Sequence, residues 1–393
     1  MSLSPSGRSV DAILGDATSG GRISAADALT LLERGDLLEL GLAAEEVRNR
    51  HNDAAVATYN IDRNINYTNV CVYKCRFCAF YREPGDAEGY LLPFEEIGRK
   101  VEETLALNGT GILMQGGVHP DLPLSYYEDL LGYLRARYPE VHLHAFSPPE
   151  IKFIARKERL SFYDVIARLK AAGLMSIPGG GAEIFDDRVR KDVLAYAKCS
   201  GDEWLDIMRQ AHRNGLRTSA TMMYGMGEPL TDRVEHFQRV RDLQDETGGF
   251  TAFISWTFQH DHTEMEDVPE TYAHEYLTTL AVSRLLIDNV RHFQTSWVTQ
   301  GKKIGQLALR FGADDMGSIM IEENVVSAAG TKHVMTQEEM EHLIRAAGYE
   351  PKQRTNLYER IVTRADTEPA AKKYRHALTP EHRGHVSPLP VVG

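Results

Sequence analysis

Three cysteines, Cys71, Cys75 and Cys78, lie within eight residues of one another, and their spacing is the strongest chemical signal in the sequence. Three thiolates on one short loop can hold three corners of a [4Fe-4S] cube. No further cysteine lies close enough in sequence to complete the set of four that an electron carrier uses. The spacing therefore predicts a cluster with one iron open for a substrate or cosubstrate.

Other uses of these thiols remain open. The fourth cysteine, Cys199, follows Lys198 in a polar stretch and fits an unpaired intracellular thiol. A zinc site would need a C-x-x-C pair with a second pair or histidines downstream. Disulfides across such short spacings are strained and leave one cysteine over. Zinc binding and purely structural cysteines are therefore the alternatives to the cluster.

The composition narrows the class of function. The 393 residues carry a formal net charge of -12, and 42% of them are hydrophobic. The acidic balance argues against a nucleic-acid groove, which needs a basic field. The sequence has no run of about 18 apolar residues, and residues 1–21 lack the basic start and apolar core of a signal peptide. We expect a soluble, cytoplasmic protein that acts on a small molecule and binds neither nucleic acid nor membrane.

The elements that must position the thiols alternate between strands and helices. Residues 64–70 are β-branched and aromatic enough for a strand, which would deliver the cysteine loop at its carboxyl end. Later apolar runs are 112–115, 141–146, 175–178, 217–223, 251–256, 293–298 and 318–321; amphipathic segments are 94–107, 126–138, 162–172, 201–214, 230–247, 273–288 and 301–311. Seven or eight such units predict an α/β fold with a (β/α)8 TIM-type barrel, and a doubly wound sheet is the alternative.

Extensions flank this predicted barrel. Helical periodicity in residues 23–50, with Ser24 as N-cap, predicts an N-terminal helical extension, and one more amphipathic segment, 336–347, precedes the C-terminal tail. We therefore divide the chain into residues 1–60, a barrel of residues 61–335, and a C-terminal helix and tail of residues 336–393. Loops with small or polar residues should share one face of the barrel with the cysteines; they are 115–119, 147–150, 178–183 and 224–228.

The cysteine motif, with the aromatic Phe77 before its last cysteine, resembles that of the radical S-adenosylmethionine (SAM) superfamily. The stretches 64–82, 144–151, 179–184, 220–225 and 311–315 resemble the branch that acts in futalosine-dependent menaquinone synthesis and in deazaflavin synthesis. Two further stretches, 244–259 and 296–301, are similar to the cyclic dehypoxanthinyl futalosine synthase family. The resemblance covers residues 22–360.

This resemblance implies a [4Fe-4S] cluster on Cys71, Cys75 and Cys78, with S-adenosyl-L-methionine as cosubstrate. It places Phe77 near the adenine, although an aromatic ring at this position could simply shield the cluster from water. A flavodoxin or ferredoxin would be the electron donor.

Further cosubstrate contacts follow from the same resemblance. It implies that exposed backbone at the second strand end binds the methionine amino group, and that a carboxylate and a guanidinium after the fourth strand bind the ribose hydroxyls and the methionine carboxylate. A tight turn and a salt bridge at the rim are the competing interpretations. The residues concerned are Gln115, Gly116, Gly117, Glu183 and Arg188.

The reaction implied by the resemblance acts on dehypoxanthinyl futalosine, where a radical at ribose C4′ attacks the aromatic ring. Loss of one electron and one proton then restores aromaticity, so a base must lie near the ring. His144, Glu150 and Asp315 are the candidate bases, and His144 also fits a satisfied strand histidine. The other candidate substrate contacts are His119, Ser147, Thr221, Tyr224, Trp256, Gln259, Trp297 and Asp314.

Three rival functions remain. Aminofutalosine synthase shares the cluster loop but adds a radical to an enol ether and loses carbon dioxide; an electron-transfer iron–sulfur protein and a zinc-stabilised binding module are more distant. Two loops, 226–229 and 259–263, also depart from the expected family pattern, and these departures bear on the substrate rather than on the radical chemistry. His260 and His262 in the second loop fit a solvated acidic loop better than a metal site.

Overall fold

The computed structural model describes residues 3–193, 198–331 and 333–378. Within these residues, ten strands form one sheet in which every pair is parallel. The strands are β1 (Val56–Asn60), β2 (Asp62–Ile65), β3 (Gly111–Met114), β4 (His142–Ala145), β5 (Ser176–Ile177), β6 (Arg217–Tyr224), β7 (Phe250–Thr257), β8 (His292–Gln294), β9 (Asp315–Ser318) and β10 (Glu350–Gln353). Their order is β10-β1-β9-β8-β7-β6-β5-β4-β3-β2.

The chain joins the last strand of this order, β2, to β1 near its other end, because a single residue, Ile61, separates β1 from β2. The carbonyls of Ile61 and Ile65 accept the amides of Thr110 and Gln115 on the β3 side, both at 3.2 Å. The alternate carbonyls of Asn60 and Asp62 face the other way and accept the amides of Ile319 (3.1 Å) and Ile321 (3.3 Å), just after β9. The sheet therefore curls around, and the predicted α/β fold of TIM-barrel type is confirmed in broad outline.

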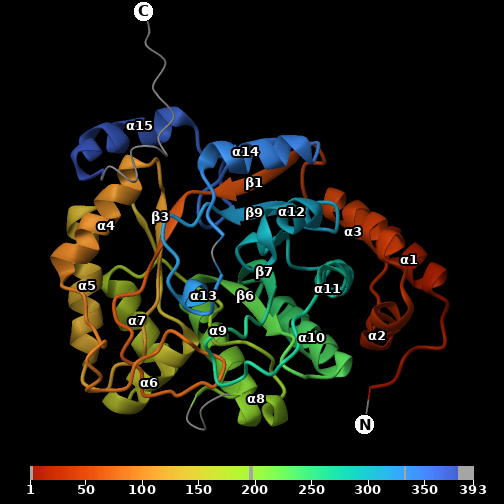
Figure 1. The fold of residues 1–393 in the computed structure, drawn as a ribbon, viewed down its shortest axis with the longest axis horizontal. Helices are drawn as coiled ribbons and strands as arrows, with labels where there is room; N and C mark the ends of the chain where they lie inside the picture. The colour runs from red at the N-terminus through yellow and green to blue at the C-terminus, as the bar shows by residue number, and fades with distance from the viewer. Residues whose placement is uncertain (1–2, 194–197, 332, 379–393) are drawn as a thin grey trace, which may run out of the picture.

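The described residues also form helices, most of which cover the outside of the curled sheet (Figure 1). They are α1 (Val10–Thr18), α2 (Ala25–Arg34), α3 (Leu37–His51), α4 (Phe94–Ala106), α5 (Leu124–Arg137), α6 (Pro148–Glu158), α7 (Phe162–Ala172), α8 (Asp187–Val193), α9 (Gly201–Arg213), α10 (Leu230–Thr247), α11 (Ala273–Leu286), α12 (Trp297–Ala308), α13 (Val325–Ala328), α14 (Gln337–Ala346) and α15 (Arg364–Lys373). Helices α2 and α3 pack on α10 and α11 at one side, while α15 packs on α4 at the other (Figure 1).

Local sequence signals explain several helix starts. Ser24 caps α2 as predicted, and the side chain of Asp27 completes its capping box. Ser147 and Glu150 form the same motif at the start of α6, where Pro148 occupies the first turn. Each box satisfies amides that a helix start otherwise leaves without partners, so these polar residues fix where the helices following the strands begin.

The structure differs from the sequence prediction at some strands. The strand predicted at residues 64–70 ends at Ile65 and begins earlier, and β1 before it and β10 near the C-terminus were both missed. The predicted strand 293–298 is shorter, because α12 already begins at Trp297 and kinks at Gly301, where φ is 78°. The proposed boundaries at residues 60 and 335 stay a prediction, and residues 379–393 of the tail lie outside the described residues.

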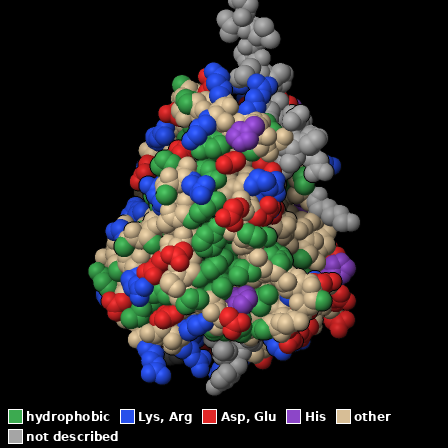
Figure 2. Space-filling view, turned by 90° about the vertical axis from the view of Figure 1, so that its left-hand side faces the viewer, with side chains coloured by type: hydrophobic (Ala, Val, Ile, Leu, Met, Phe, Trp, Pro, Cys, Tyr) green, Lys and Arg blue, Asp and Glu red, His purple; other side chains and the backbone are tan. Residues whose placement is uncertain are grey.

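The surface shows no single-sign field on the side drawn in Figure 2. Basic and acidic side chains are interspersed there around a band of hydrophobic ones. In the described part of the chain, no helix combines the length and the apolar character that crossing a membrane requires.

Candidate active site

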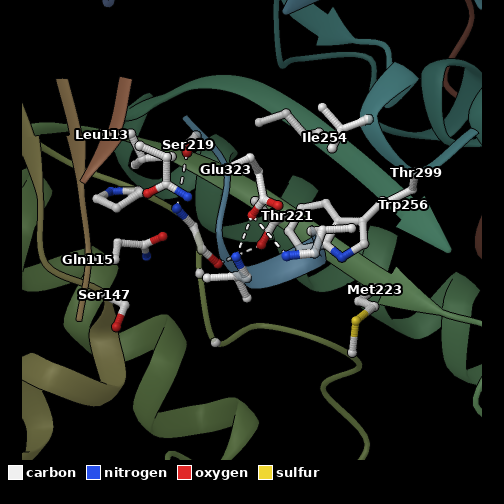
Figure 3. A pocket seen from close by; sticks show the side chains of 18 of the residues that line it. Leu113, Gln115, Ser147, Ser219, Thr221, Met223, Ile254, Trp256, Thr299 and Glu323 are labelled. Carbon is white, nitrogen blue, oxygen red and sulfur yellow. Dashed lines mark hydrogen bonds between the residues drawn. The ribbon is translucent and has the colours of Figure 1, made fainter. Parts of the chain in front are cut away.

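A cavity of about 480 Å³ occupies the inside of the curled sheet and reaches the cysteine loop. Figure 3 shows Gln115 and Ser147 on one side of it and Trp256 and Thr299 on the other. Its lining includes most of the residues predicted for the site: Cys71, Cys75, Phe77, Cys78, Gln115, Gly116, Gly117, His144, Ser147, Glu183, Thr221, Trp256, Gln259 and Trp297. Residues far apart in sequence therefore meet around one space.

The cysteine loop is held by backbone hydrogen bonds at both ends. The amide of Cys71 donates to the carbonyl of Arg82 (2.9 Å), and the amide of Cys78 donates to the carbonyl of Cys75 (3.0 Å). All four cysteines of the chain are free, which argues against the disulfide alternative. Burial raises the pKa of the Cys71 thiol to about 11 and also raises the pKa of Cys78, with Cys75 adding to the second shift.

These thiols fit an iron–sulfur cluster better than a single ion. In the described ranges, no three or more His, Cys, Asp or Glu side chains are grouped so that they could hold one metal ion. A zinc site needs about four ligands around one centre, whereas a four-iron cube receives each thiolate at a separate corner. Partly buried thiols with raised pKa values, such as Cys71 and Cys78, need a cationic partner to ionise, and a cluster supplies one.

Just after β3, Gly116 and Gly117 form a wall of the cavity that carries no side chains, the glycine wall. A Cβ atom on Gly116 would lie 2.5 Å from the ring of Tyr67, and one on Gly117 would lie 2.4 Å from the carbonyl of Val70. The amide of Gly117 donates to Thr68 (2.8 Å) and that of Gly116 to Glu150 (3.2 Å). Their carbonyls accept no hydrogen bond from the described residues, so acceptors remain here for an ammonium group.

Glu150 stands behind this wall rather than in the cavity lining. Its carboxylate accepts hydrogen bonds from the Tyr67 hydroxyl (2.6 Å), the Ser147 hydroxyl (2.6 Å) and amide (2.7 Å), and the Gly116 amide (3.2 Å). Burial raises the pKa of Glu150 against these hydrogen bonds. Glu150, a candidate base, therefore holds the glycine wall in position through these hydrogen bonds.

A cation that sequence reasoning missed lies beside the cysteines. Lys198 Nζ is 2.9 Å from Glu183 Oε1 and 4.8 Å from the centre of the Phe77 ring. Burial disfavours the charge of Lys198, but Cys75 and Glu183 outweigh this effect and raise its pKa. The other carboxylate oxygen of Glu183, Oε2, is buried and lacks a hydrogen-bond partner among the described residues, although Arg190 Nη1 lies at 3.6 Å.

The structure does not bring Arg188 into the cavity. Its side chain is 77% exposed, and its guanidinium contacts Asp186 (3.1 Å) and Asp232 (3.3 Å) at the rim. Arg190 instead turns inward and holds backbone carbonyls, including that of Ile184 at 2.9 Å. Of the two interpretations of Arg188 raised by the sequence, this placement matches the rim salt bridge.

His144 reaches the cavity from β4. Its Nδ1 lies 2.6 Å from the hydroxyl of Ser176 on β5, and its Nε2 makes no hydrogen bond within the described part of the chain. Burial is the main reason that the pKa of His144 falls to about 3, followed by the nearby His142 and Arg354. A neutral imidazole with one nitrogen facing the cavity is available as a base or a hydrogen-bond partner.

The segment after β10 forms the floor of the cavity with Arg354, Asn356 and Tyr358. Tyr358 stacks at 4.1 Å on His292, and a Cβ atom on Gly111 would lie 2.2 Å from the Asn356 side chain. His292 and Gly111 are the first residues of β8 and β3, so this segment covers the amino ends of the strands. The polar composition of the tail gave no signal for this role.

Asp315 and Asp314 support this floor and do not line the cavity. Asp315 receives two hydrogen bonds from Arg354, at 2.6 and 2.8 Å, and one from the Thr58 hydroxyl at 2.6 Å. Asp314 lies 2.7 Å from His292 and 3.3 Å from Arg284. Among the described lining residues, Lys198 and Arg354 are the only Lys or Arg side chains, one near each end of the cavity.

Two other candidates, His119 and Tyr224, also lie outside the lining. The departures from the family pattern have structural roles: Glu228 accepts the amides of Gly225 and Met226, both at 2.8 Å, and pairs with Arg233 at 2.7 Å. His260 contacts Asp261 at 2.9 Å, in keeping with a polar loop.

Comparison with known proteins identifies the family to which this fold and this site belong. Residues 65–240 match the model of the radical SAM superfamily, and residues 247–366 match the model described as the CofH/MqnC C-terminal region. The chain is a radical SAM enzyme. The FeFe-hydrogenase maturase HydG of Carboxydothermus hydrogenoformans shares the fold with a TM-score of 0.67 at 15% identity, over 95% of this chain and 86% of that one. Methylornithine synthase gives 0.66 at 17% identity, over 91% and 99%.

Sequence relatives define the family. The chain is 46% identical to the cyclic dehypoxanthine futalosine synthase of Halalkalibacterium halodurans, over 93% of this chain and 99% of the relative. It is 45% identical to the synthase of the same name from Streptomyces coelicolor, over 90% and 89%. The aminodeoxyfutalosine synthase of Streptomyces coelicolor is 39% identical, over 90% and 95%. The chain belongs to the family of the cyclic dehypoxanthine futalosine synthases.

Proposed function

We propose that this enzyme converts dehypoxanthinyl futalosine to its cyclic product in menaquinone synthesis, with a [4Fe-4S] cluster on Cys71, Cys75 and Cys78 and SAM as cosubstrate. The observation that carries the proposal is one continuous cavity that joins these thiols to His144 and Arg354. When bound, the reduced cluster and SAM supply a deoxyadenosyl radical that removes a hydrogen atom from the substrate.

The family relationship favours the cyclase over the aminodeoxyfutalosine synthase, at 45–46% against 39% identity. We also infer a (β/α)8 barrel in which β1 and β2 count as one strand, since their residues bond to β3 on one edge and to the chain after β9 on the other. A flavodoxin or ferredoxin is the proposed electron donor.

Different residues of the cavity bind different parts of SAM. The free carbonyls of Gly116 and Gly117 accept the methionine ammonium, and the Lys198 ammonium, beside the cysteines, binds the carboxylate. Glu183 Oε2, which has an ion-pair contact with Arg190 but no hydrogen bond from the described residues, accepts a ribose hydroxyl, and the ring of Phe77 packs on the adenine. Lys198 takes the role that the sequence suggested for Arg188, because Arg188 is exposed.

The opposite end of the cavity suits the substrate. Its carboxylated aromatic ring needs a cation, and Arg354 is the lining cation far from the cysteines. Arg354 has N–H groups left after its two bonds to Asp315 and one to the carbonyl of Thr355 (3.2 Å), and the pairing with Asp315 holds its fork in place. Trp256 and Trp297 supply aromatic walls, and His144 Nε2 is the group placed to take the ring proton.

A substrate deuterated at ribose C4′ tests the proposal. The enzyme should release deoxyadenosine one mass unit heavier, together with a product two hydrogens lighter than the substrate. Aminofutalosine synthase chemistry would instead join the deoxyadenosyl carbon to an enol ether and release carbon dioxide. Formation of that adduct, with no free deoxyadenosine, would contradict the choice of reaction.

A further inference from the structure

Strand β4 carries two histidines that line different cavities. His142 and His144 are two residues apart and therefore lie on the same face of the strand. His144 lines the active-site cavity, whereas His142 lines a second cavity of about 350 Å³. Asn356 lines both cavities, so the segment that forms the floor of the first also forms a wall of the second.

One buried hydroxyl connects the two rings. Ser176 Oγ lies 2.6 Å from His144 Nδ1 and 2.6 Å from His142 Nε2, and Ser176 is fully buried. This hydroxyl has no other hydrogen-bond partner among the described residues. Because it carries a single proton, it can donate to only one ring, and the other ring must donate to it.

Two arrangements of protons satisfy this constraint. In the first, His144 Nδ1–H donates to Ser176 and Ser176 donates to His142 Nε2, which leaves His144 Nε2 bare and a proton on His142 Nδ1. In the second, every bond is reversed, so His144 Nε2 carries a proton and His142 Nδ1 is bare. Both arrangements hold three protons, and they differ only in which cavity faces a bare nitrogen.

We propose that His144, Ser176 and His142 form a relay that carries the proton lost from the substrate ring out of the active-site cavity into the second cavity. The proposal rests on the proposed function, which requires loss of this proton. His144 is then the catalytic base, while Ser176 and His142 are positioning residues that act through it.

The step balances in atoms and charge. The ring C–H bond breaks with its electron pair left in the ring, and one electron leaves the ring for a one-electron acceptor of the iron–sulfur class. The proton goes to His144 Nε2, His144 Nδ1 passes a proton to Ser176, Ser176 passes its own to His142 Nε2, and His142 Nδ1 releases one. The first arrangement becomes the second, and one proton has left the cavity.

The surroundings of the two rings fit this direction of transfer. The second cavity is lined by the exposed residues Glu140, Arg360 and Asp366, so it leads to solvent, which receives the proton. Burial lowers the pKa of His142 to about 4 and that of His144 to about 3, so both rings are neutral at rest and pass the proton on rather than store it. After product leaves, water in both cavities restores the first arrangement.

The test separates hydrogen abstraction from proton loss. In the reconstituted enzyme with dehypoxanthinyl futalosine, His142→Gly and Ser176→Ala should still form deoxyadenosine, but the ratio of cyclic product to deoxyadenosine should fall by about 100-fold, the lower end of what a positioned acid–base group contributes. Added imidazole should restore the ratio in His142→Gly by entering the second cavity. His212→Gln is the matched control, because His212 also bonds two hydroxyls, at 2.6 and 2.8 Å, but lines neither cavity.

A second readout does not need the cluster. Nitrogen-15 NMR of the histidines in the apoprotein should find His142 and His144 in the same tautomer, both Nδ1–H or both Nε2–H, and Ser176→Ala should remove this agreement. Unchanged product ratios in both variants, or equal losses of product and deoxyadenosine without rescue by imidazole, would overturn the relay alone. Absence of deoxyadenosine from the wild type with this substrate would overturn the proposed function as well.

Discussion

Replacement of Lys198 tests which cation binds SAM. The Lys198 side chain is only 9% exposed and pairs with Glu183 at 2.9 Å, whereas Arg188 is 77% exposed. A charged hydrogen bond in a closed site contributes about 1.5–3 kcal/mol. Lys198→Met should therefore weaken SAM binding by roughly 10- to 150-fold. Arg188→Ala should leave the affinity unchanged.

The same replacement also affects folding, and the design must account for this effect. Without Lys198, the buried carboxylate of Glu183 keeps only Arg190, at 3.6 Å, and breaking a buried pair costs about 3–5 kcal/mol. The double variant Lys198→Met/Glu183→Gln removes the orphaned charge, so its unfolding free energy should recover. Comparison of this variant with Glu183→Gln alone isolates the contribution of Lys198 to binding.

The assay is titration of SAM against the anaerobically reconstituted proteins, with thermal unfolding of each variant alongside. We expect the loss of affinity to persist in the double variant relative to Glu183→Gln. Equal affinities in that comparison would show that Lys198 acts only through folding. A loss of affinity in Arg188→Ala but not in the Lys198 variants would refute the assignment and restore the interpretation suggested by the sequence.

Three further predictions concern the cluster, the glycine wall and acid stability. Cys75→Ala leaves two thiolates and should lose the bound iron and the visible absorbance. The buried Cys199 lies outside the cavity lining, so Cys199→Ala should keep the iron and the absorbance. Loss of iron from Cys199→Ala would make Cys199 a ligand. Glu150→Gln cannot accept all of the present donors, so it should lower the unfolding free energy by about 1–3 kcal/mol and weaken SAM binding, while Glu203→Gln, in the capping box of α9, should leave that binding intact. Burial lowers the pKa of His236 to about 3, so the unfolded chain binds a proton at higher pH than the folded chain does, and the unfolding free energy should fall as the pH drops from about 6.5 toward 3. In His236→Gln, the slope of unfolding free energy against pH should be shallower by about 1.4 kcal/mol per pH unit. An equal slope in the two proteins would show that His236 is not the titrating group.

Much of the fold could be predicted because its signals are local. Alternating apolar runs and amphipathic segments predict parallel strands and their helices, and the spacing of the cysteines is a property of one short loop. By contrast, β10 has the sequence Glu350-Pro-Lys-Gln353, without β-branched or aromatic residues. Its place beside β1 depends on tertiary contacts, which outweigh propensity in a short strand.

The candidate site shows the same division. Residues at strand ends, such as Gln115 and Ser147, were found because a parallel sheet gathers its strand ends on one face. Lys198 and Arg354 were missed, since neither shares a motif or a regular sequence spacing with the residues that it meets in space. Lys198 follows the cysteine loop by more than a hundred residues, and Arg354 meets Asp315 across the amino ends of the strands. No spacing rule links such pairs.

The three candidate bases illustrate how partners decide a role. The carboxylate of Glu150 accepts hydrogen bonds from Tyr67, Ser147 and Gly116, and the carboxylate of Asp315 accepts hydrogen bonds from Arg354 and Thr58. A carboxylate so occupied would have to break hydrogen bonds before it could accept a proton, and neither lines the cavity. His144 differs because only one of its nitrogens is engaged, and the hydroxyl that engages it connects to His142. The imidazole, which on sequence grounds also fitted a satisfied strand histidine, is therefore the group that the structure leaves available for the ring proton.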